Sequence, residues 1–521
     1  MKHAVSGACV GALFVVLAGC KDSGEGRVPT TSKASDSISS LVLDTTLSGL
    51  IRKNNLSGDA SEGRTIPTID SPLAQLGMHL FFSKSLGGDQ DVGCVSCHHP
   101  ALGGGDDLSL PIGIHSDTPD LLGPGRTIAG TSIPNVPRNA PTTFNIALWD
   151  SALFLDGRVE SLTRTPGVNG EGGDIRTPDS AFGQADPLAG LNLSIAQTRF
   201  PVTSVEEMRG SLLPGDTNEA VRTHLAERLD GTNSELQTPD TASDADNLPD
   251  WPTAFAAAFS DPQITYARIG QAIAAYEQSQ VFVDTPWKAY IEGDTGALTL
   301  AQKEGAVLFY TPVAEGGAGC AGCHSGDFMT DELFHNIGMV QVGPGKGNGP
   351  NSTGDFGRFR ETGVEADRFA FRTPTLLNVA VTGPYGHAGS YDDLEGVIRH
   401  HLNASDAVDD FFASAGTWCQ QMAQFTNIAD CDALYPNAES DTRSGLDKLI
   451  ADQTAGTSRL SNAALDDSQV ASLVAFMEAL TDPCLTDASC LAPWIPDTST
   501  LGLSDLQLNG INGNHQPLLT N

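Results

Sequence analysis

The apolar residues of the chain fall into a few short stretches with helical spacing, separated by long polar segments rich in glycine and proline. Residues 73–82 (LAQLGMHLFF) and 300–310 (LAQKEGAVLFY) each place apolar side chains three or four positions apart, which is the spacing of one helix face. Residues 267–280 and 468–480 have the same spacing. No long alternating stretch predicts a large sheet. The pattern therefore predicts a mainly α-helical protein with long loops and little strand.

The first two stretches belong to an internal repeat. Each leads through a loop into the same C-x-x-C-H pattern, which is Cys94–His98 in the first copy and Cys320–His324 in the second. Repetition at this length favours duplicated modules over one continuous fold. The length of 521 residues is also too great for one compact core, so two domains are expected.

The C-x-x-C-H pattern is the attachment signature of a c-type haem. Its two cysteines can form thioether bonds to the haem, and the histidine is placed to ligate the iron from the proximal side. One C-x-x-C alone also fits a redox pair or half a zinc site, but the two motifs lie more than two hundred residues apart. We therefore predict two covalent haems, held by Cys94, Cys97 and His98 and by Cys320, Cys323 and His324.

A helix that leads into such a motif is typical of the start of a cytochrome c fold, so the repeat predicts two cytochrome c-like haem domains. Residues 66–289 form the first and residues 290–482 the second, with a break at Asp284–Trp287 before the link. Residues 483–521 read as an irregular tail. Residues 21–65 are rich in Ser, Gly, Asp and Thr, which predicts a flexible tether.

Residues 1–20 have the features of an export signal. Lys2 precedes an apolar run over residues 8–17 that is too short to span a membrane. The run ends in LAGC, which resembles the lipidation signal of bacterial lipoproteins and makes Cys20 the anchor. An ordinary signal peptide cut nearby is the alternative. We expect a periplasmic protein whose only link to the membrane is the lipid on Cys20.

The net charge of −35 argues against nucleic acid and anionic membrane surfaces as partners. It suits a basic redox partner, although solubility alone also explains it.

Four cysteines remain after the haem motifs, the anchor and Cys9 of the signal are set aside. They are Cys419, Cys431, Cys484 and Cys490, an even number in an oxidising compartment, so disulfides are expected rather than free thiols. Pairing nearest neighbours gives Cys419–Cys431 and Cys484–Cys490, one of three connectivities.

Over about residues 70–482 the chain resembles the bacterial di-haem cytochrome c peroxidase family, which includes the MauG-type enzymes. The matching segments surround both motifs. They are LGMHLFF, CVSCHHPALGGGD, PRNAPTTFN, FLDGRVESL and VEEM in the first half, and GCAGCHSGDFMTD, LFHNIG, DFGRFRETG and FRTPTLLNVAVTGPYGHAGSYDDLEGVIRHH in the second.

The resemblance implies that the first haem is the peroxidatic one. The family's catalytic acid matches Glu207, with Glu206 beside it as the alternative. Such a carboxylate takes a proton from the near peroxide oxygen and returns it to the far one. The family also has a second histidine that ligates this haem and can leave it. His115 matches that position, with one extra residue before it. Two roles therefore stay open for His115, a removable haem ligand or a surface-loop histidine.

At the second haem the family position of the distal ligand falls on His401, where the peroxidases have Met and the MauG-type enzymes Tyr. Ligation by two histidines would lower the haem potential relative to His/Met. His400 lies beside it, but neighbours on a helix point in different directions, so only one can face the iron. The alternative is that neither His400 nor His401 ligates the iron and both lie at the surface.

The family also holds a calcium ion between the haems. The matching ligands are the side chain of Asn139 and the backbone carbonyls of Thr382 and Pro384, with waters, an all-oxygen set that suits Ca²⁺.

A second departure from the family concerns the route between the haems. The family has a Trp where this chain has Leu155. Trp149 is an alternative relay, but we interpret it as a core aromatic.

The resemblance implies an oxidoreductase of the cytochrome c peroxidase type. It would reduce hydrogen peroxide to water with electrons from a small donor, a cytochrome c or a cupredoxin, that enter at the second haem. One alternative is MauG-like oxidation of a protein or organic substrate through high-valent haem. The other is a bis-His electron-transfer lipoprotein without catalysis. A homodimer is left open.

Overall fold

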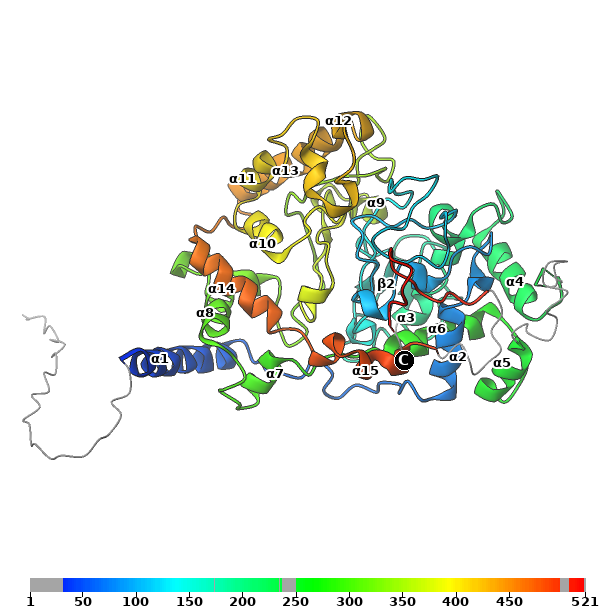
Figure 1. The fold of residues 1–521 in the computed structure, drawn as a ribbon, viewed down its shortest axis with the longest axis horizontal. Coiled ribbons are helices and arrows are strands. Elements are labelled where there is room, and N and C mark those ends of the chain that lie inside the picture. Colours follow the sequence, from blue (N-terminus) through cyan, green and yellow to red (C-terminus); the bar gives the residue numbers. More distant parts are fainter. Residues whose placement is uncertain (1–30, 173, 234, 237–249, 497–505, 520–521) are drawn as a thin grey trace, which may run out of the picture.

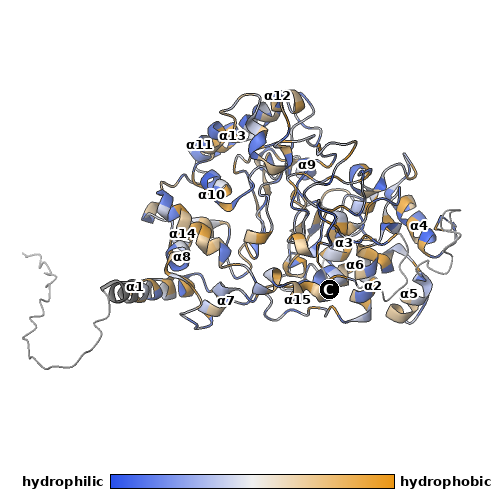
Figure 2. Cartoon of the chain, viewed as in Figure 1, coloured by the Kyte–Doolittle hydropathy of each residue, from blue (hydrophilic) through white to orange (hydrophobic). Residues whose placement is uncertain are grey.

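The computed structural model describes residues 31–172, 174–233, 235–236, 250–496 and 506–519. It is mainly helical, with one three-stranded and one two-stranded sheet of very short strands in the described ranges, connected by long loops (Figure 1). This confirms the predicted fold class. Individual helices mix apolar and polar side chains, as α10 (Leu394–Leu402) does in Figure 2.

In the first half, α2 (Pro72–Phe81) packs along α6 (Tyr266–Gln278). Ser71 caps α2, because its side chain accepts a hydrogen bond from the Ala74 N–H, a usual way to begin a helix. The two helices touch at Gly77, where an added Cβ would lie 1.8 Å from the Ala272 carbonyl oxygen. Around this pair lie α3 (Leu193–Gln197), α4 (Asn218–Leu229), α5 (Trp251–Phe259) and the antiparallel strands β1 (Ala152–Leu153), β2 (Val159–Ser161) and β3 (Ile175–Arg176).

The second half repeats this contact. Helix α8 (Leu300–Tyr310) packs on α14 (Asp467–Glu478), and a Cβ at Gly305 would lie 1.9 Å from the Ser472 carbonyl oxygen. The sequence repeat is thus also a repeat of packing. The other elements are α7 (Pro286–Ile291), α9 (Phe359–Thr362), α10, α11 (Ala404–Phe411), α12 (Cys431–Leu434), α13 (Ala438–Ala455) and the pair β4 (Phe334–His335) and β5 (Phe371–Arg372). The limits of the two domains stay predictions.

The prediction of a flexible tether over residues 21–65 is wrong where the chain is described. Residues Thr31–Lys53 form helix α1, which lies against α8 (Figure 1). Asp44 accepts hydrogen bonds from Lys303 Nζ (2.8 Å) and the Tyr290 hydroxyl (2.7 Å), and Leu47 is buried in the apolar cluster of the second half. Composition suggested a tether because polar residues dominate, but it cannot see that Leu47, Leu50 and Ile51 turn toward the apolar cluster of the second half.

The predicted tail also has more order than expected. Helix α15 (Ala488–Leu491) follows the second half, and residues 506–519 return to the first half. There the Leu508 N–H bonds the Phe82 carbonyl at 2.9 Å and the Ile511 N–H bonds the Asp120 carbonyl at 2.9 Å. The C-terminal segment therefore joins the two halves.

Both expected disulfides are present. Cys419 pairs with Cys431 and Cys484 with Cys490, while the four cysteines of the C-x-x-C-H motifs are unpaired thiols. The signal segment and Cys20 lie outside the described residues. Within the described ranges no helix is both long and apolar enough to cross a bilayer.

Candidate haem sites

The first C-x-x-C-H motif opens onto a cavity in the first half of the molecule. The cysteines lie on and after a one-turn 3-10 helix, Cys94–Ser96. His98 Nδ1 lies 3.2 Å from the Gly104 carbonyl, and a hydrogen bond there leaves Nε2 free to ligate a metal. The cavity is lined by the motif, by apolar groups and by a few polar ones, among them Cys94, Cys97, His98, Val136, Ile146, Trp149, Leu153, Leu155, Arg158, Glu207, Met208, Lys346 and Arg372. Two free thiols and a histidine on one mostly apolar cavity fit a covalent haem.

Glu207 lines the same cavity as His98. It lies on a single π-helical turn, Val205–Arg209, and π turns are frequent at functional sites. Its neighbour Glu206 is exposed. Burial raises the pKa of Glu207, against the opposing charges of Arg158 and Lys346. The arrangement favours Glu207 over Glu206, since a carboxyl with a raised pKa beside a reaction site can exchange protons near neutral pH.

The structure does not bring His115 to this cavity. Its side chain is 57% exposed, and Nε2 lies 2.9 Å from Asp89 Oδ2. The preceding residues hold it outward, because Gly113 rests on the Glu206 backbone, where a Cβ would lie 2.2 Å from the carbonyl oxygen. The buried Arg126 also bonds the Ile112 and Gly113 carbonyls, at 2.8 and 3.1 Å. The structure thus places His115 on a surface loop, one of the two positions left open for it, and its role as a removable haem ligand stays a prediction.

At the second motif, two histidines face one another across a gap of the right size for an iron. The ring centres of His324 and His401 are 6.4 Å apart. A metal–imidazole bond is about 2.0–2.1 Å and the ring centre lies about 1 Å beyond the nitrogen, so two axial imidazoles have centres about 6 Å apart. His324 Nδ1 lies 3.3 Å from the Met329 carbonyl oxygen, and His401 Nδ1 lies 2.8 Å from the Val397 carbonyl oxygen. Both Nε2 atoms are therefore left for the metal.

His400 has no nitrogen to spare. Its Nδ1 lies 2.9 Å from the Tyr391 hydroxyl and its Nε2 lies 3.0 Å from the Ile337 carbonyl. Burial lowers the pKa of His400 to about 3 and that of His324 to about 4, so both rings are neutral. The arrangement favours His401 as the distal ligand and gives His400 a role in packing α10.

Two of the three residues expected at a calcium site are in contact. Asn139 Nδ2 lies 2.9 Å from the Pro384 carbonyl oxygen. Thr382, two residues before Pro384 in the chain, packs against Gly103, where a Cβ would be 3.3 Å from its Cα. A half-turn of the Asn139 amide exchanges its oxygen and nitrogen, which would direct Oδ1 to the same place as the Pro384 carbonyl. The donor chemistry then fits Ca²⁺.

Comparison with known proteins agrees with these sites. The family described as di-haem cytochrome c peroxidase matches residues 71–296. The chain is 27% identical to the methylamine utilization protein MauG of Methylorubrum extorquens over 332 residues, 64% of this chain and 69% of that protein. It is 27% identical to cytochrome c551 peroxidase of Pseudomonas aeruginosa over 338 residues, 64% of this chain and 73% of that one. The chain belongs to the di-haem cytochrome c peroxidase family.

Among solved structures, a MauG-like protein associated with microbial copper homeostasis has 23% sequence identity and a TM-score of 0.49, covering 82% of this chain and 96% of that one. Membership makes this di-haem peroxidase an oxidoreductase with two c-type haems.

Sequence reasoning missed the cations that line the peroxidase's first cavity, among them Arg158 and Lys346. Lys346 belongs to the second half and reaches the cavity from the loop GPGKGNGP, in which Gly343, Gly345, Gly347 and Gly349 all have positive φ. It has no ion-pair partner among the described residues. A lone lysine among glycines in a chain with far more acidic than basic residues was the available signal.

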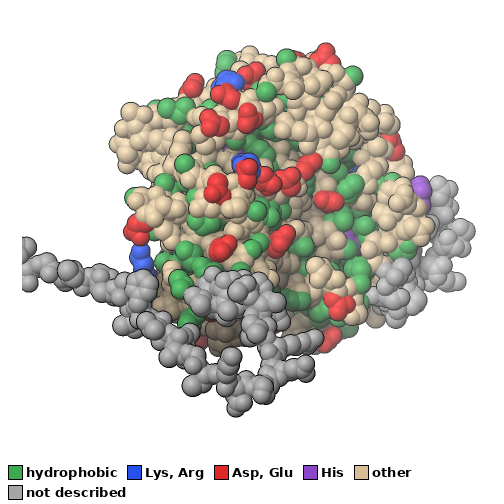
Figure 3. Space-filling model, turned by 60° about the vertical axis from the view of Figure 1, so that its left-hand side comes forward, with side chains coloured by type: hydrophobic (Ala, Val, Ile, Leu, Met, Phe, Trp, Pro, Cys, Tyr) green, Lys and Arg blue, Asp and Glu red, His purple; other side chains and the backbone are tan. Residues whose placement is uncertain are grey.

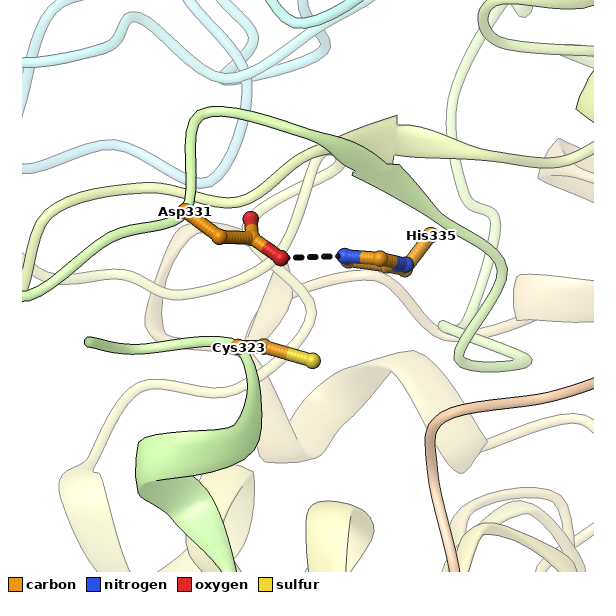
Figure 4. Close-up of side chains that lie close together, drawn as sticks. All are labelled: Cys323, Asp331 and His335. Atoms are coloured by element: carbon orange, nitrogen blue, oxygen red, sulfur yellow. Dashed lines mark hydrogen bonds and ion pairs between the residues drawn. The ribbon is translucent and has the colours of Figure 1, made fainter.

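Beside the second motif, Cys323, Asp331 and His335 lie close together (Figure 4). His335 Nε2 is 2.8 Å from Asp331 Oδ2, and one ligand atom from each of the three residues lies within 4.8 Å of the others. Such a trio has the donors of a metal site, but Cys323 is needed for the haem thioether. We therefore interpret the pair of Asp331 and His335 as part of the wall of the second haem site.

Proposed function

We propose that this protein reduces hydrogen peroxide to water, with chemistry at the first haem and electrons that enter at the second. The observation that supports this most directly is that His98 and Glu207 line one cavity. The second site, by contrast, has histidines placed for both axial positions, which suits electron transfer and leaves no position for a substrate.

The haem at the first site supplies an iron on which the O–O bond can be cleaved. His98 would hold that iron through Nε2. Glu207 would accept the proton of the near oxygen and return it to the far one as water leaves. Arg158 and Lys346 supply positive charge along the same cavity, where a low dielectric strengthens their effect on developing negative charge.

The electron donor would be a small redox protein, a cytochrome c or a cupredoxin. The face of the molecule in Figure 3 carries many acidic and few basic side chains, in line with 64 acidic against 29 basic residues in the chain. A donor with a basic face would be steered toward such a surface. The setting would be the periplasm, with an acyl anchor on Cys20.

A calcium ion held by Asn139, Thr382 and Pro384 would lie between the halves. Asn139 comes from the first half and the two carbonyls from the second. The ion would therefore fix the relative position of the two haem sites.

The test is peroxide turnover by the haem-loaded protein, pre-reduced and supplied with calcium and a reduced cytochrome or dye. For Glu207→Gln we expect kcat to fall by about 10²–10⁴-fold, the usual contribution of a general acid–base group. The matched control is Glu206→Gln, which changes the exposed neighbour and should leave turnover intact. Equal activity of wild type and Glu207→Gln would contradict the proposal.

A second candidate, MauG-like oxidation of a protein or organic substrate, is favoured by His401 in place of Met. Electron paramagnetic resonance of the oxidised and half-reduced protein separates the candidates. A first haem that becomes high-spin on half-reduction supports peroxide reduction. A distinct high-valent signal with peroxide and no turnover supports the second candidate, and low spin throughout indicates an electron carrier.

A further inference from the structure

Trp149 lies in contact with the surroundings of both haem motifs. It lines the first cavity together with His98. Its ring also meets the Phe328 ring edge-on, with centres 5.1 Å apart. Phe328 directly precedes Met329, whose carbonyl lies 3.3 Å from His324 Nδ1. A continuous path of contacts thus runs from the first cavity through Trp149 and Phe328 to the proximal histidine of the second site.

We propose that Trp149 carries electrons between the two haem sites and that Arg372 sets how readily its ring is oxidised. This rests on the proposed function, in which electrons enter at the second haem. Leu155 also lines the first cavity, but it has no oxidisable ring. Trp149 is buried, with 5% of its surface exposed, which agrees with its interpretation as a core aromatic. Its place between the two haem motifs gives it a second role.

The guanidinium of Arg372 lies over the Trp149 ring, with Cζ 3.5 Å from the ring centre. Arg372 is buried. Its Nη1 donates to the Ala152 carbonyl at 2.7 Å, while Nε has no hydrogen-bond partner. Among the described residues no carboxylate lies within ion-pair distance of it. Glu332 and Asp156 act on the guanidinium only from beyond that distance, so its positive charge lies nearest to the indole face.

A cation on the face of an indole favours the neutral ring and repels the positive charge of an oxidised one. Arg372 would therefore make Trp149 a relay that does not retain the oxidising equivalent. In each transfer one electron leaves the second site and reaches the first, with the Trp149 ring as the coupling between them. The ring itself is oxidised only while the first site holds the oxidising equivalent taken from peroxide, and it then gives one electron to the first site and takes one from the second. No bond breaks and no proton moves, the ring ends unchanged, and the external redox protein replaces the electron lost from the second site.

The decisive measurement is the rate of electron redistribution between the haems after rapid reduction of the full-length, haem-loaded protein by pulse radiolysis, without peroxide. For Trp149→Phe we expect a rate about tenfold or more below wild type, a barrier increase of about 1.4 kcal/mol or more. The matched control is Trp287→Phe, another buried tryptophan, which packs on Tyr290 and Tyr310 and does not line the cavity. It should keep the wild-type rate.

Arg372→Met removes the charge and keeps most of the side-chain volume. After addition of peroxide we expect a longer-lived tryptophan radical in its electron paramagnetic resonance spectrum, which Arg372→Met/Trp149→Phe should lack. An unchanged redistribution rate in folded Trp149→Phe overturns the relay, even if Arg372→Met fails to fold. This rate is measured without peroxide. It therefore tests the relay even if the protein proves not to reduce peroxide.

Discussion

The two haem sites share an attachment motif and a packing contact, yet they differ in the residues that face the motif histidine. The first opens onto a cavity whose charged lining includes Glu207, Arg158 and Lys346. The second is closed by His401 at the spacing of two axial ligands. Duplicated modules therefore supply the same cofactor twice, and the distal residues decide whether the iron is open to a substrate or limited to electron transfer.

The largest expected effect comes from opening the second site. In His401→Ala the second iron loses one of its two imidazoles, so its ferric resonance spectrum should convert completely from low spin to high spin, while the first haem keeps its signal. The control His400→Gln changes the neighbouring histidine, whose nitrogens are both hydrogen-bonded within the protein, and should stay low-spin. A low-spin second haem in His401→Ala would show that the distal ligand is another residue.

The next effect tests whether the repeated helix contact supports each half separately. In Gly77→Ala or Gly305→Ala the new Cβ would lie 1.8 or 1.9 Å from a backbone carbonyl oxygen. The facing helices must therefore separate, and we expect a loss of about 3 kcal/mol in the free energy of unfolding. Melting followed at the haem bands should show the first haem losing its native ligation early in one variant and the second in the other.

Gly49→Ala is the matched control, since no atom lies within 4 Å of its added Cβ. It should be neutral or stabilising by about 0.5–1 kcal/mol, because alanine is the better helix former. If both haems lost their native ligation at the same temperature in Gly77→Ala and in Gly305→Ala, the halves would unfold as one unit.

The sequence predicted what depends on local pattern. The haem motifs, the helices that lead into them, both disulfides and the helical fold class follow from spacing and residue type. The apolar face of α1 could not be found from composition, since Leu47 is buried only because it joins the same apolar cluster of the second half as Phe309 and Phe476. The surface position of His115 could not be chosen from the sequence, because it depends on the contact of Gly113 with the Glu206 backbone and on the bond from Arg126 to the Ile112 carbonyl.

Residues that reach a site from the other half are the hardest to predict. Lys346 and Trp149 lie on loops, and only the packing of the two halves shows that one enters the first cavity and the other touches both sites. The choice between His400 and His401 was open for the same reason, because it depends on which nitrogens are already bound by Tyr391 and Ile337.

The smallest effect concerns the pH dependence of the first site. Glu207 must be ionised to accept a proton, and burial raises its pKa above that of an ordinary glutamate. Below that pKa, kcat/KM for peroxide should fall about tenfold per pH unit, since each unit removes that factor of the ionised form. Arg158 and Lys346 oppose the rise, so Lys346→Gln should move the acidic limb to higher pH.

Glu206→Gln should leave the acidic limb within a few tenths of a unit, because the exposed Glu206 contributes only a lesser repulsion to Glu207. A limb that stays in place in Lys346→Gln would mean that the lysine does not act on the carboxyl. The two sites would then be electrostatically separate. A shifted limb would mean that the second half contributes a charge to the chemistry of the first.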